Sequence, residues 1–284
     1  MWFNPEAGET LLYVAGCCHP DDDLNYVEVV VHYKVGPNNN MTVSLDPSVN
    51  PILGDKRVAK LLDEKGVETG DCPVNREYIR RKASGDDDGA RAIGRSTKFI
   101  FNVIPIAHRN KASEDWRDLP DQQLRPYMCG STVWEGILDL FFTEGDITDP
   151  SKAVLVRLVK SGKGLQTRYK ISADSETLRD PLDLGDEVHE MLEAALQEGG
   201  QGDLYRMVAN MVRPPEEVEA LLSGIQLSEQ SAPSSSKPKI SARGSRKTSK
   251  AKAEEAPASD DAGGDDELDA LERELAKRGR GRGR

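Results

Sequence analysis

The chain has 284 residues, of which 37% are hydrophobic and only 5% are aromatic. This composition supports one sizeable folded core, but not a core that includes the whole chain. The formal net charge is −11. It does not exclude a nucleic-acid partner, because phosphate binding depends on where Lys and Arg side chains gather rather than on the total charge.

Membrane and secreted proteins are the classes that the sequence argues against. No stretch has the roughly 18 consecutive apolar residues that a membrane-spanning helix needs, and residues 1–20 lack the basic and apolar regions of a secretory signal. The four cysteines are irregularly spaced and do not suggest a disulfide framework. We therefore expect a cytoplasmic protein with reduced thiols and no membrane partner.

The first half of the folded part has the pattern of strands with a polar insertion. Residues 26–35 and 41–45 are β-type, and the turn-forming residues between them predict a β-hairpin. Residues 58–82 have a polar, helix-compatible pattern, and residues 84–95 read as a loop rich in Gly, Asp and Arg. Residues 98–106 (KFIFNVIPI) predict a third strand.

The second half predicts a helix, a second hairpin and two further helices. Residues 133–142 carry apolar side chains at helical spacing. Residues 153–160 and 167–172 are β-type and flank a turn with Ser, Gly and Lys, which predicts a hairpin with a basic tip. Residues 183–197 and 214–222 are helical by pattern.

The predicted domain boundary follows the last of these helices. Residues 1–225 are expected to form the folded domain. Residues 226–284 are rich in Ser, Pro, Ala and charge, cannot bury a core, and predict a disordered linker and mixed-charge tail. Within the tail, a basic block precedes an acidic block at residues 254–274 and Gly-Arg repeats.

A series of short motifs along residues 2–172 resembles one known family. The motifs are WFNP with GE, VVVHYKVG, CPV, KFIFNVI, WE, GDITDP and GKGLQTRY. In this order they are similar to the single-stranded-DNA-binding, helix-destabilising proteins of large tailed phages. The resemblance implies an oligonucleotide-binding (OB) barrel. The expected fold class is therefore β-rich α+β, an OB barrel with inserted loops and helices, followed by a disordered tail.

The resemblance also implies a function and partners. It implies sequence-independent binding and protection of single-stranded DNA during phage DNA replication, recombination and repair, with possible self-association along the DNA. Replication or recombination proteins would be contacted through the C-terminal tail. If a phage encodes the chain, the location is the host cytoplasm.

The chain departs from the metal-binding version of the family, which holds zinc with one His and three Cys ligands. His32 and Cys72 stand in the first and third positions, whereas Ser44 and Asn75 occupy the other two. Neither a hydroxyl nor an amide replaces a thiolate well, so we expect a degenerate site without metal. A zinc site rescued by another of the cysteines is the alternative.

Single strands are held by positive grooves along the phosphates and by aromatic faces on which bases stack. The basic run at residues 80–82 is the first choice for phosphate contacts, with a solvated helix face as the alternative. Alternation along the second hairpin puts Tyr169 on one face and Arg168 and Lys170 on the other, where a solvated edge strand is the alternative. The expected DNA-binding residues are Tyr78, Arg80, Arg81, Lys82, Lys98, Trp116, Arg157, Lys160, Lys163, Arg168, Tyr169 and Lys170.

A rival function is suggested by residues 19–23 (HPDDD). They are similar to a motif of zinc-dependent de-N-acetylases, in which His19 and Asp22 would ligate the metal with His108 or His189. That family needs βαβ alternation, which the rest of the chain lacks. Walker-type loops, nucleophile elbows and dinucleotide fingerprints are also absent from the sequence. We therefore expect a non-enzymatic binding protein, with a hydrolase or an RNA-binding or scaffolding protein as alternatives.

Overall fold

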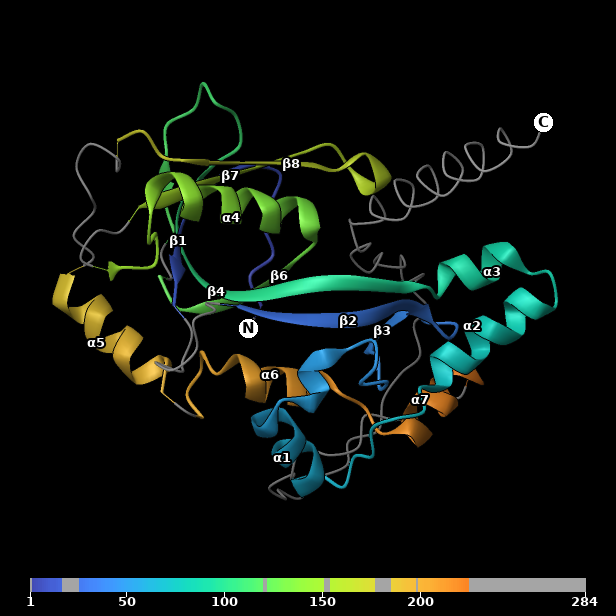
Figure 1. Cartoon of the computed structure of the whole chain (residues 1–284). Coiled ribbons are helices and arrows are strands. Elements are labelled where there is room, and N and C mark those ends of the chain that lie inside the picture. The colour runs from blue at the N-terminus through green and yellow to red at the C-terminus, as the bar shows by residue number, and fades with distance from the viewer. Residues whose placement is uncertain are drawn as a thin grey trace, which may run out of the picture.

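The computed structural model describes residues 2–16, 26–119, 122–150, 154–176, 185–197 and 199–224. Within these ranges the chain is an α+β protein built on one large antiparallel sheet (Figure 1). The strands are β1 (Gly8–Ala15), β2 (Tyr26–Val35), β3 (Asn40–Val43), β4 (Arg95–Arg109), β5 (Arg117–Asp118), β6 (Arg125–Cys129), β7 (Leu155–Ser161) and β8 (Arg168–Ala173). The helices are η1 (Pro51–Gly54), α1 (Lys56–Glu64), α2 (Pro73–Ala83), α3 (Asp87–Ala92), α4 (Ser131–Glu144), η3 (Gly164–Gln166), α5 (Gly185–Ala195), α6 (Leu204–Met211) and α7 (Pro215–Leu222).

The sheet is organised around β4, the longest of the described strands. On one edge β4 pairs with β2 over residues 95–101 and with β1 over residues 102–109, while β6 and β5 pair with its other edge. The strand order is β3-β2-β4-β1-β7-β8. No pairing joins the two ends of this order among the described strands. The expected α+β class is therefore confirmed, and the described sheet is open.

A β-bulge interrupts the pairing of β4 with β1. The register between β1 and β4 shifts between Leu11 and Leu12, so that Ile106 is left without a partner in β1. The residue before it, Pro105, has no N–H to donate and is tolerated in a sheet at such irregularities. A bulge bends the strand and increases its twist.

Helices cover both faces of the sheet (Figure 1). On one face α4 buries Trp134 and Ile137 against Phe101, Tyr127 and Val156. On the other face α1, α6 and α7 pack near β2, and α5 packs near β1. None of the described helices is long and apolar enough to cross a membrane.

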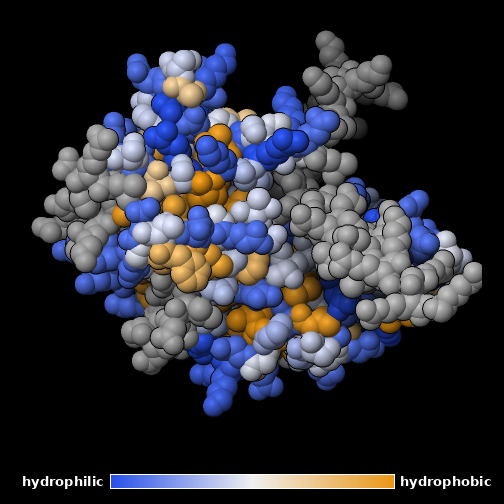
Figure 2. Space-filling view, turned by 45° about the horizontal axis from the view of Figure 1, so that its top comes forward, coloured by the Kyte–Doolittle hydropathy of each residue, from blue (hydrophilic) through white to orange (hydrophobic). Residues whose placement is uncertain are grey.

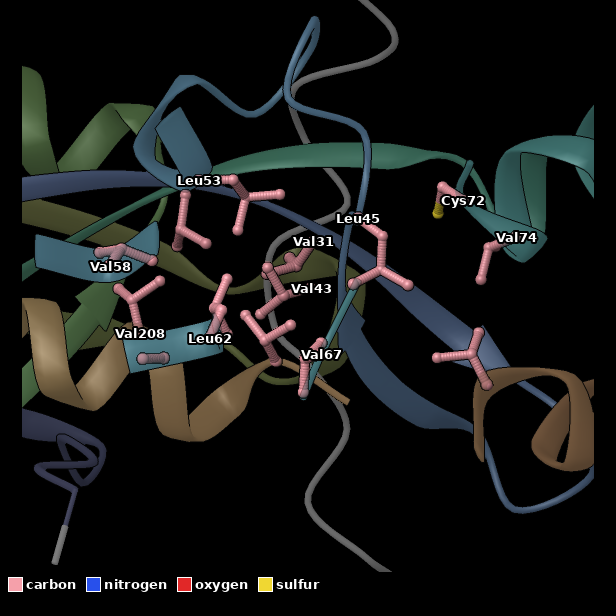
Figure 3. Close-up of a cluster of buried hydrophobic side chains, with 14 of the residues drawn as sticks. Val31, Val43, Leu45, Leu53, Val58, Leu62, Val67, Cys72, Val74 and Val208 are labelled. Carbon is pink, nitrogen blue, oxygen red and sulfur yellow. The ribbon is translucent and has the colours of Figure 1, made fainter. Parts of the chain in front are cut away.

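A core cluster fills the space between the sheet and α1, α6 and α7. Val58 and Leu62 lie four residues apart, so they share one face of α1. Figure 3 shows both beside Val208 of α6, with Val31 of the sheet nearby. Cys72, at the start of α2, belongs to the same cluster.

The structure confirms several expected elements and corrects others. The hairpins β2–β3 and β7–β8 and the apolar helix α4 are present as expected. The prediction of a loop throughout residues 84–95 is wrong, because α3 forms there with Asp86 accepting a hydrogen bond from the Gly89 amide. The sequence reasoning also missed α6, whose first turn is capped by Asp203. The expected tail lies outside the described residues.

We predict that Leu62→Ala lowers the free energy of unfolding by about 2–5 kcal/mol, because it leaves a cavity in a core that cannot fully collapse. Asp63→Ala, at the next and exposed position, should change it by less than about 0.5 kcal/mol. Urea unfolding followed by circular dichroism measures both. Equal effects of the two substitutions would contradict the packing of α1 against the sheet.

Candidate nucleic-acid interface

The β7–β8 hairpin separates its basic and aromatic side chains as the alternation predicted. Tyr169 and Ile171 of β8 are half-buried and pack against the cluster beneath α4. Arg168 and Lys170 are exposed on the opposite face of the strand. The hairpin therefore presents a basic face to solvent and uses its aromatic face for packing.

The turn of this hairpin borders a shallow hollow. Its volume is about 450 Å³, and its lining includes Lys160, Lys163 and residues 4–7, among them the acidic Glu6. The Lys160 Nζ donates a hydrogen bond of 3.3 Å to the Pro5 carbonyl oxygen, while Lys163 is exposed. Gly162 has φ +80°, and a Cβ there would lie 2.1 Å from the Gln166 carbonyl oxygen. A side chain at this position would thus disrupt the turn.

Three cations of the hairpin have no carboxylate partner in the described part of the chain. Lys163, Arg168 and Lys170 are exposed, and none forms an ion pair with another described residue. An exposed cation without an internal partner can neutralise a phosphate without breaking an existing contact. These side chains are therefore available for a polyanion.

An aromatic and arginine cluster lies nearer the centre of the sheet. The Arg109 guanidinium carbon lies 4.3 Å from the Trp116 ring centroid, and that of Arg157 lies 5.6 Å away. Arg109 pairs with Glu9 at 2.7 Å, and Arg157 pairs with Asp174 at 2.5 Å. Trp116 is half-buried against the core near α5. It therefore covers the sheet beside two arginines, with part of the indole left exposed.

The strand register joins this cluster to the hairpin face. Arg157 lies opposite Ser172, so it shares a face with Lys170 and Arg168. Sequence reasoning selected Arg157 and Trp116 but missed Arg109. Its contact with the indole depends on β5 pairing with β4, which brings the Trp116 loop back to the sheet.

The basic run of α2 lies at the opposite end of the molecule from α5 (Figure 1) and is internally neutralised. Glu77 accepts hydrogen bonds from Arg80 at 2.6 Å and from Arg81 at 2.7 Å. The hydrogen bond from Arg80 is the largest cause that lowers the pKa of Glu77 to about 2. Lys82 pairs with Asp87 at 2.9 Å. A phosphate that binds these cations must compete with carboxylates already in place.

Two other expected contacts are turned toward the protein. Lys98 is 3% exposed, and its Nζ lies 5.4 Å from the Tyr33 ring centroid. A side chain buried in this way does not reach a DNA strand bound at the protein surface, so Lys98 does not contact DNA. Tyr78 is half-buried against the core cluster that contains Val58.

Figure 2, which views the face toward α4 and β8, shows apolar patches set among mostly hydrophilic side chains.

The residues of the degenerate zinc site are partly brought together. His32 is fully buried, and its Nε2 lies 3.8 Å from the Cys72 Sγ. Its Nδ1 lies 2.9 Å from the Ile93 carbonyl oxygen. A carbonyl can only accept, so Nδ1 carries a proton and Nε2 is left to accept from the thiol or, in the ionised pair, to donate to the thiolate.

The other two positions do not complete a zinc site. Ser44 is buried, and its hydroxyl has no hydrogen-bond partner among the described residues. The Asn75 amide is directed at Asp46, 3.5 Å away. No group of three or more His, Cys, Asp or Glu side chains suited to a metal occurs within the described ranges. This donor set does not fit structural zinc, which takes four Cys or His ligands.

The His32 contact changes the acidity of the buried thiol. Burial raises the pKa of Cys72, but the hydrogen bond with His32 and those with the backbone of Leu45 and Asn75 lower it. The net result is a pKa lowered from 9.0 to about 7. The folded state therefore favours the thiolate more than the unfolded chain does.

We predict that Cys72 adds stability at high pH. Because the folded pKa is depressed, this stabilisation is fully present above the unfolded value of 9.0 and is lost as the pH falls through about 7. The difference in unfolding free energy between wild type and Cys72→Ala should therefore grow between pH 6.5 and pH 9. Leu62→Ala removes no titratable group and is the control. A difference that does not depend on pH would show that the thiol keeps its proton.

The de-N-acetylase motif at residues 19–23 lies outside the described residues. Of its suggested third ligands, His108 has its Nδ1 3.1 Å from the Thr10 hydroxyl, and His189 lies on α5. In comparisons with known proteins, no family model matches this chain and no curated protein is found to be similar to it.

Proposed function

We propose that the protein binds single-stranded DNA without sequence preference, along the exposed face of the β7–β8 hairpin, and that it is not an enzyme. The observation that carries this proposal is the set of three exposed cations without a carboxylate partner among the described residues: Lys163, Arg168 and Lys170. By contrast, the cations of α2 are paired with Glu77 and Asp87. The hairpin is therefore preferred over α2 as the binding surface because its three exposed cations lack carboxylate partners among the described residues.

The chemistry of such a surface favours binding without base readout. Lys and Arg side chains that neutralise phosphates release counterions, and this contribution does not depend on sequence. Trp116 is half-buried beside Arg109 and Arg157, so part of its ring stays exposed near the inner end of the hairpin. Bases stack on such aromatic surfaces with little preference for their identity.

We propose in addition that the sheet belongs to an OB-type fold. The OB-fold is a five-stranded, partly open barrel, so an open strand order does not argue against it. The bulge at Ile106 supports the curvature that a barrel requires, because it bends β4 within the half that pairs with β1.

The partners belong to the proposal as well. We infer from the sequence that the acidic residues 254–274 contact replication or recombination proteins and that bound copies associate along the DNA. RNA binding is kept as an outcome of the test, since phosphate neutralisation and stacking do not distinguish the two nucleic acids.

We predict that a fluorescence anisotropy titration shows tighter binding to single-stranded DNA than to duplex, and that the affinity falls with salt. Single strands contribute a slope of about −0.7 in log affinity against log salt for each phosphate contact. The triple variant Lys163→Ala, Arg168→Ala, Lys170→Ala should therefore make the slope shallower by about 2.

The matched control is Arg80→Ala, Arg81→Ala, Lys82→Ala, which removes the same three charges from α2. Its change in slope should be less than about 1, because Glu77 and Asp87 already neutralise that run. A larger effect in α2 than in the hairpin would move the interface to α2. Equal binding of duplex and single strand would contradict the proposal. Tighter binding to single-stranded RNA than to single-stranded DNA would show that RNA is the ligand.

We predict that Trp116→Ala weakens binding to single strands by about 1–3 kcal/mol and leaves the salt slope unchanged, because stacking releases no counterion. Trp116→Phe keeps an aromatic ring and should retain most of the affinity. Thermal melting of both variants separates this effect from loss of packing near α5. A shallower salt slope for Trp116→Ala would indicate that the indole acts only by positioning Arg109 and Arg157.

A further inference from the structure

A second basic site lies away from the hairpin, between α1 and α6. A hollow of about 340 Å³ opens at the first turns of these two helices. Its lining includes Lys56, Lys60 and Arg206, all exposed, together with the half-buried Arg57 and the ring of Tyr205. Four cations from two helices thus border one small cavity.

Positive charge exceeds negative charge around this hollow, because Asp203 is the one carboxylate among the described residues that line it. Lys56, Lys60 and Arg206 form no ion pair with another described residue. Lys56 and Lys60 are also four residues apart on α1, a spacing at which like charges repel. Such crowding is unfavourable in the empty protein and is relieved when an anion binds.

Asp203 lines the hollow and Asp55 directly precedes Lys56, and both carboxylates already accept hydrogen bonds. Asp55 accepts hydrogen bonds from the backbone amide and the guanidinium of Arg57. Asp203 accepts from the backbone amides of Arg206 and Gly199, at 3.0 and 2.8 Å. The first turns of both helices are thus capped, so the charge offered to a ligand comes from side chains.

The walls of the hollow are held in place. The Arg57 guanidinium carbon lies 3.5 Å from the Tyr205 ring centroid, which joins the first turns of the two helices. Farther along, the Lys65 Nζ donates to the Ala209 carbonyl oxygen at 2.9 Å and to the Asn210 side chain at 2.6 Å. A preformed site has a smaller entropic cost of binding than one that must be ordered by its ligand.

We propose that this hollow binds a phosphate group, with Lys56, Lys60 and Arg206 as its ligands. Its volume lies within the range of about 300–1,000 Å³ that is usual for small-molecule sites, and Lys and Arg form strong charge-assisted hydrogen bonds with phosphate oxygens. The phosphate could belong to a free phosphorylated compound or to the backbone of a bound strand. The site itself does not depend on the function proposed for the hairpin.

The test uses inorganic pyrophosphate as the probe and isothermal titration calorimetry of the full chain. Wild type should bind pyrophosphate, and the triple variant Lys56→Gln, Lys60→Gln, Arg206→Gln should bind it at least about tenfold more weakly, since charge-assisted hydrogen bonds are lost. The matched control is Arg80→Gln, Arg81→Gln, Lys82→Gln, which removes three charges from α2, where Glu77 and Asp87 already pair with the cations, and should keep the wild-type affinity. Thermal melting verifies that both variants fold.

The outcomes separate this site from the hairpin. No binding by wild type, or an equal loss in both variants, overturns the proposal. If an oligothymidine strand displaces pyrophosphate from wild type but not from the hairpin variant Lys163→Ala, Arg168→Ala, Lys170→Ala, the phosphate belongs to a strand that reaches both sites. If pyrophosphate and the strand bind together, the ligand is a free phosphorylated compound. The pyrophosphate titration needs no strand, so its result stands whether or not the hairpin binds DNA.

Discussion

The rest of the structure depends on the pairing of β4 with four other strands. Its first half pairs with β2 and its second half with β1, while β6 and β5 pair along the opposite edge. The bulge at Ile106 bends β4 within the half that pairs with β1. The β7–β8 hairpin reaches β4 only through β1, and the Trp116 loop returns to the same strand through β5. The position of the proposed interface is therefore set by β4.

The local balance of charge, more than its total, distinguishes the basic surfaces of this acidic chain. The cations of α2 face Glu77 and Asp87, whereas Lys163 and Lys170 of the hairpin region have no carboxylate partner in the described residues. The hollow between α1 and α6 is a third case, in which the nearby carboxylates are used as helix caps. Surfaces with the same number of Lys and Arg side chains therefore bind phosphate with different affinities, because a paired cation must first leave its carboxylate partner.

The buried His32–Cys72 pair joins the start of α2 to the sheet. His32 is fixed on its other side by the Ile93 carbonyl oxygen, after α3. One imidazole therefore connects β2 with both ends of the segment that holds α2 and α3. A buried polar pair of this kind is stabilising while both partners are present and costly when one is removed, because the other is left without a hydrogen bond.

The sequence by itself determined the elements with a strong local period and the faces of their side chains. Alternation along β8 separated Tyr169 from its basic neighbours, and the spacing of Glu77 before the α2 run already contained the signal for the ion pairs found there. Tertiary structure alone decided that Lys98 is buried and that Trp116 stacks on Arg109. The physical reason is that the alternation of side chains along a strand assigns each one to a face of that strand. Whether the side chain is buried, and what it contacts, depends on which helices and loops cover that face. Strand pairings between residues far apart in the sequence bring these helices and loops to the face that they cover.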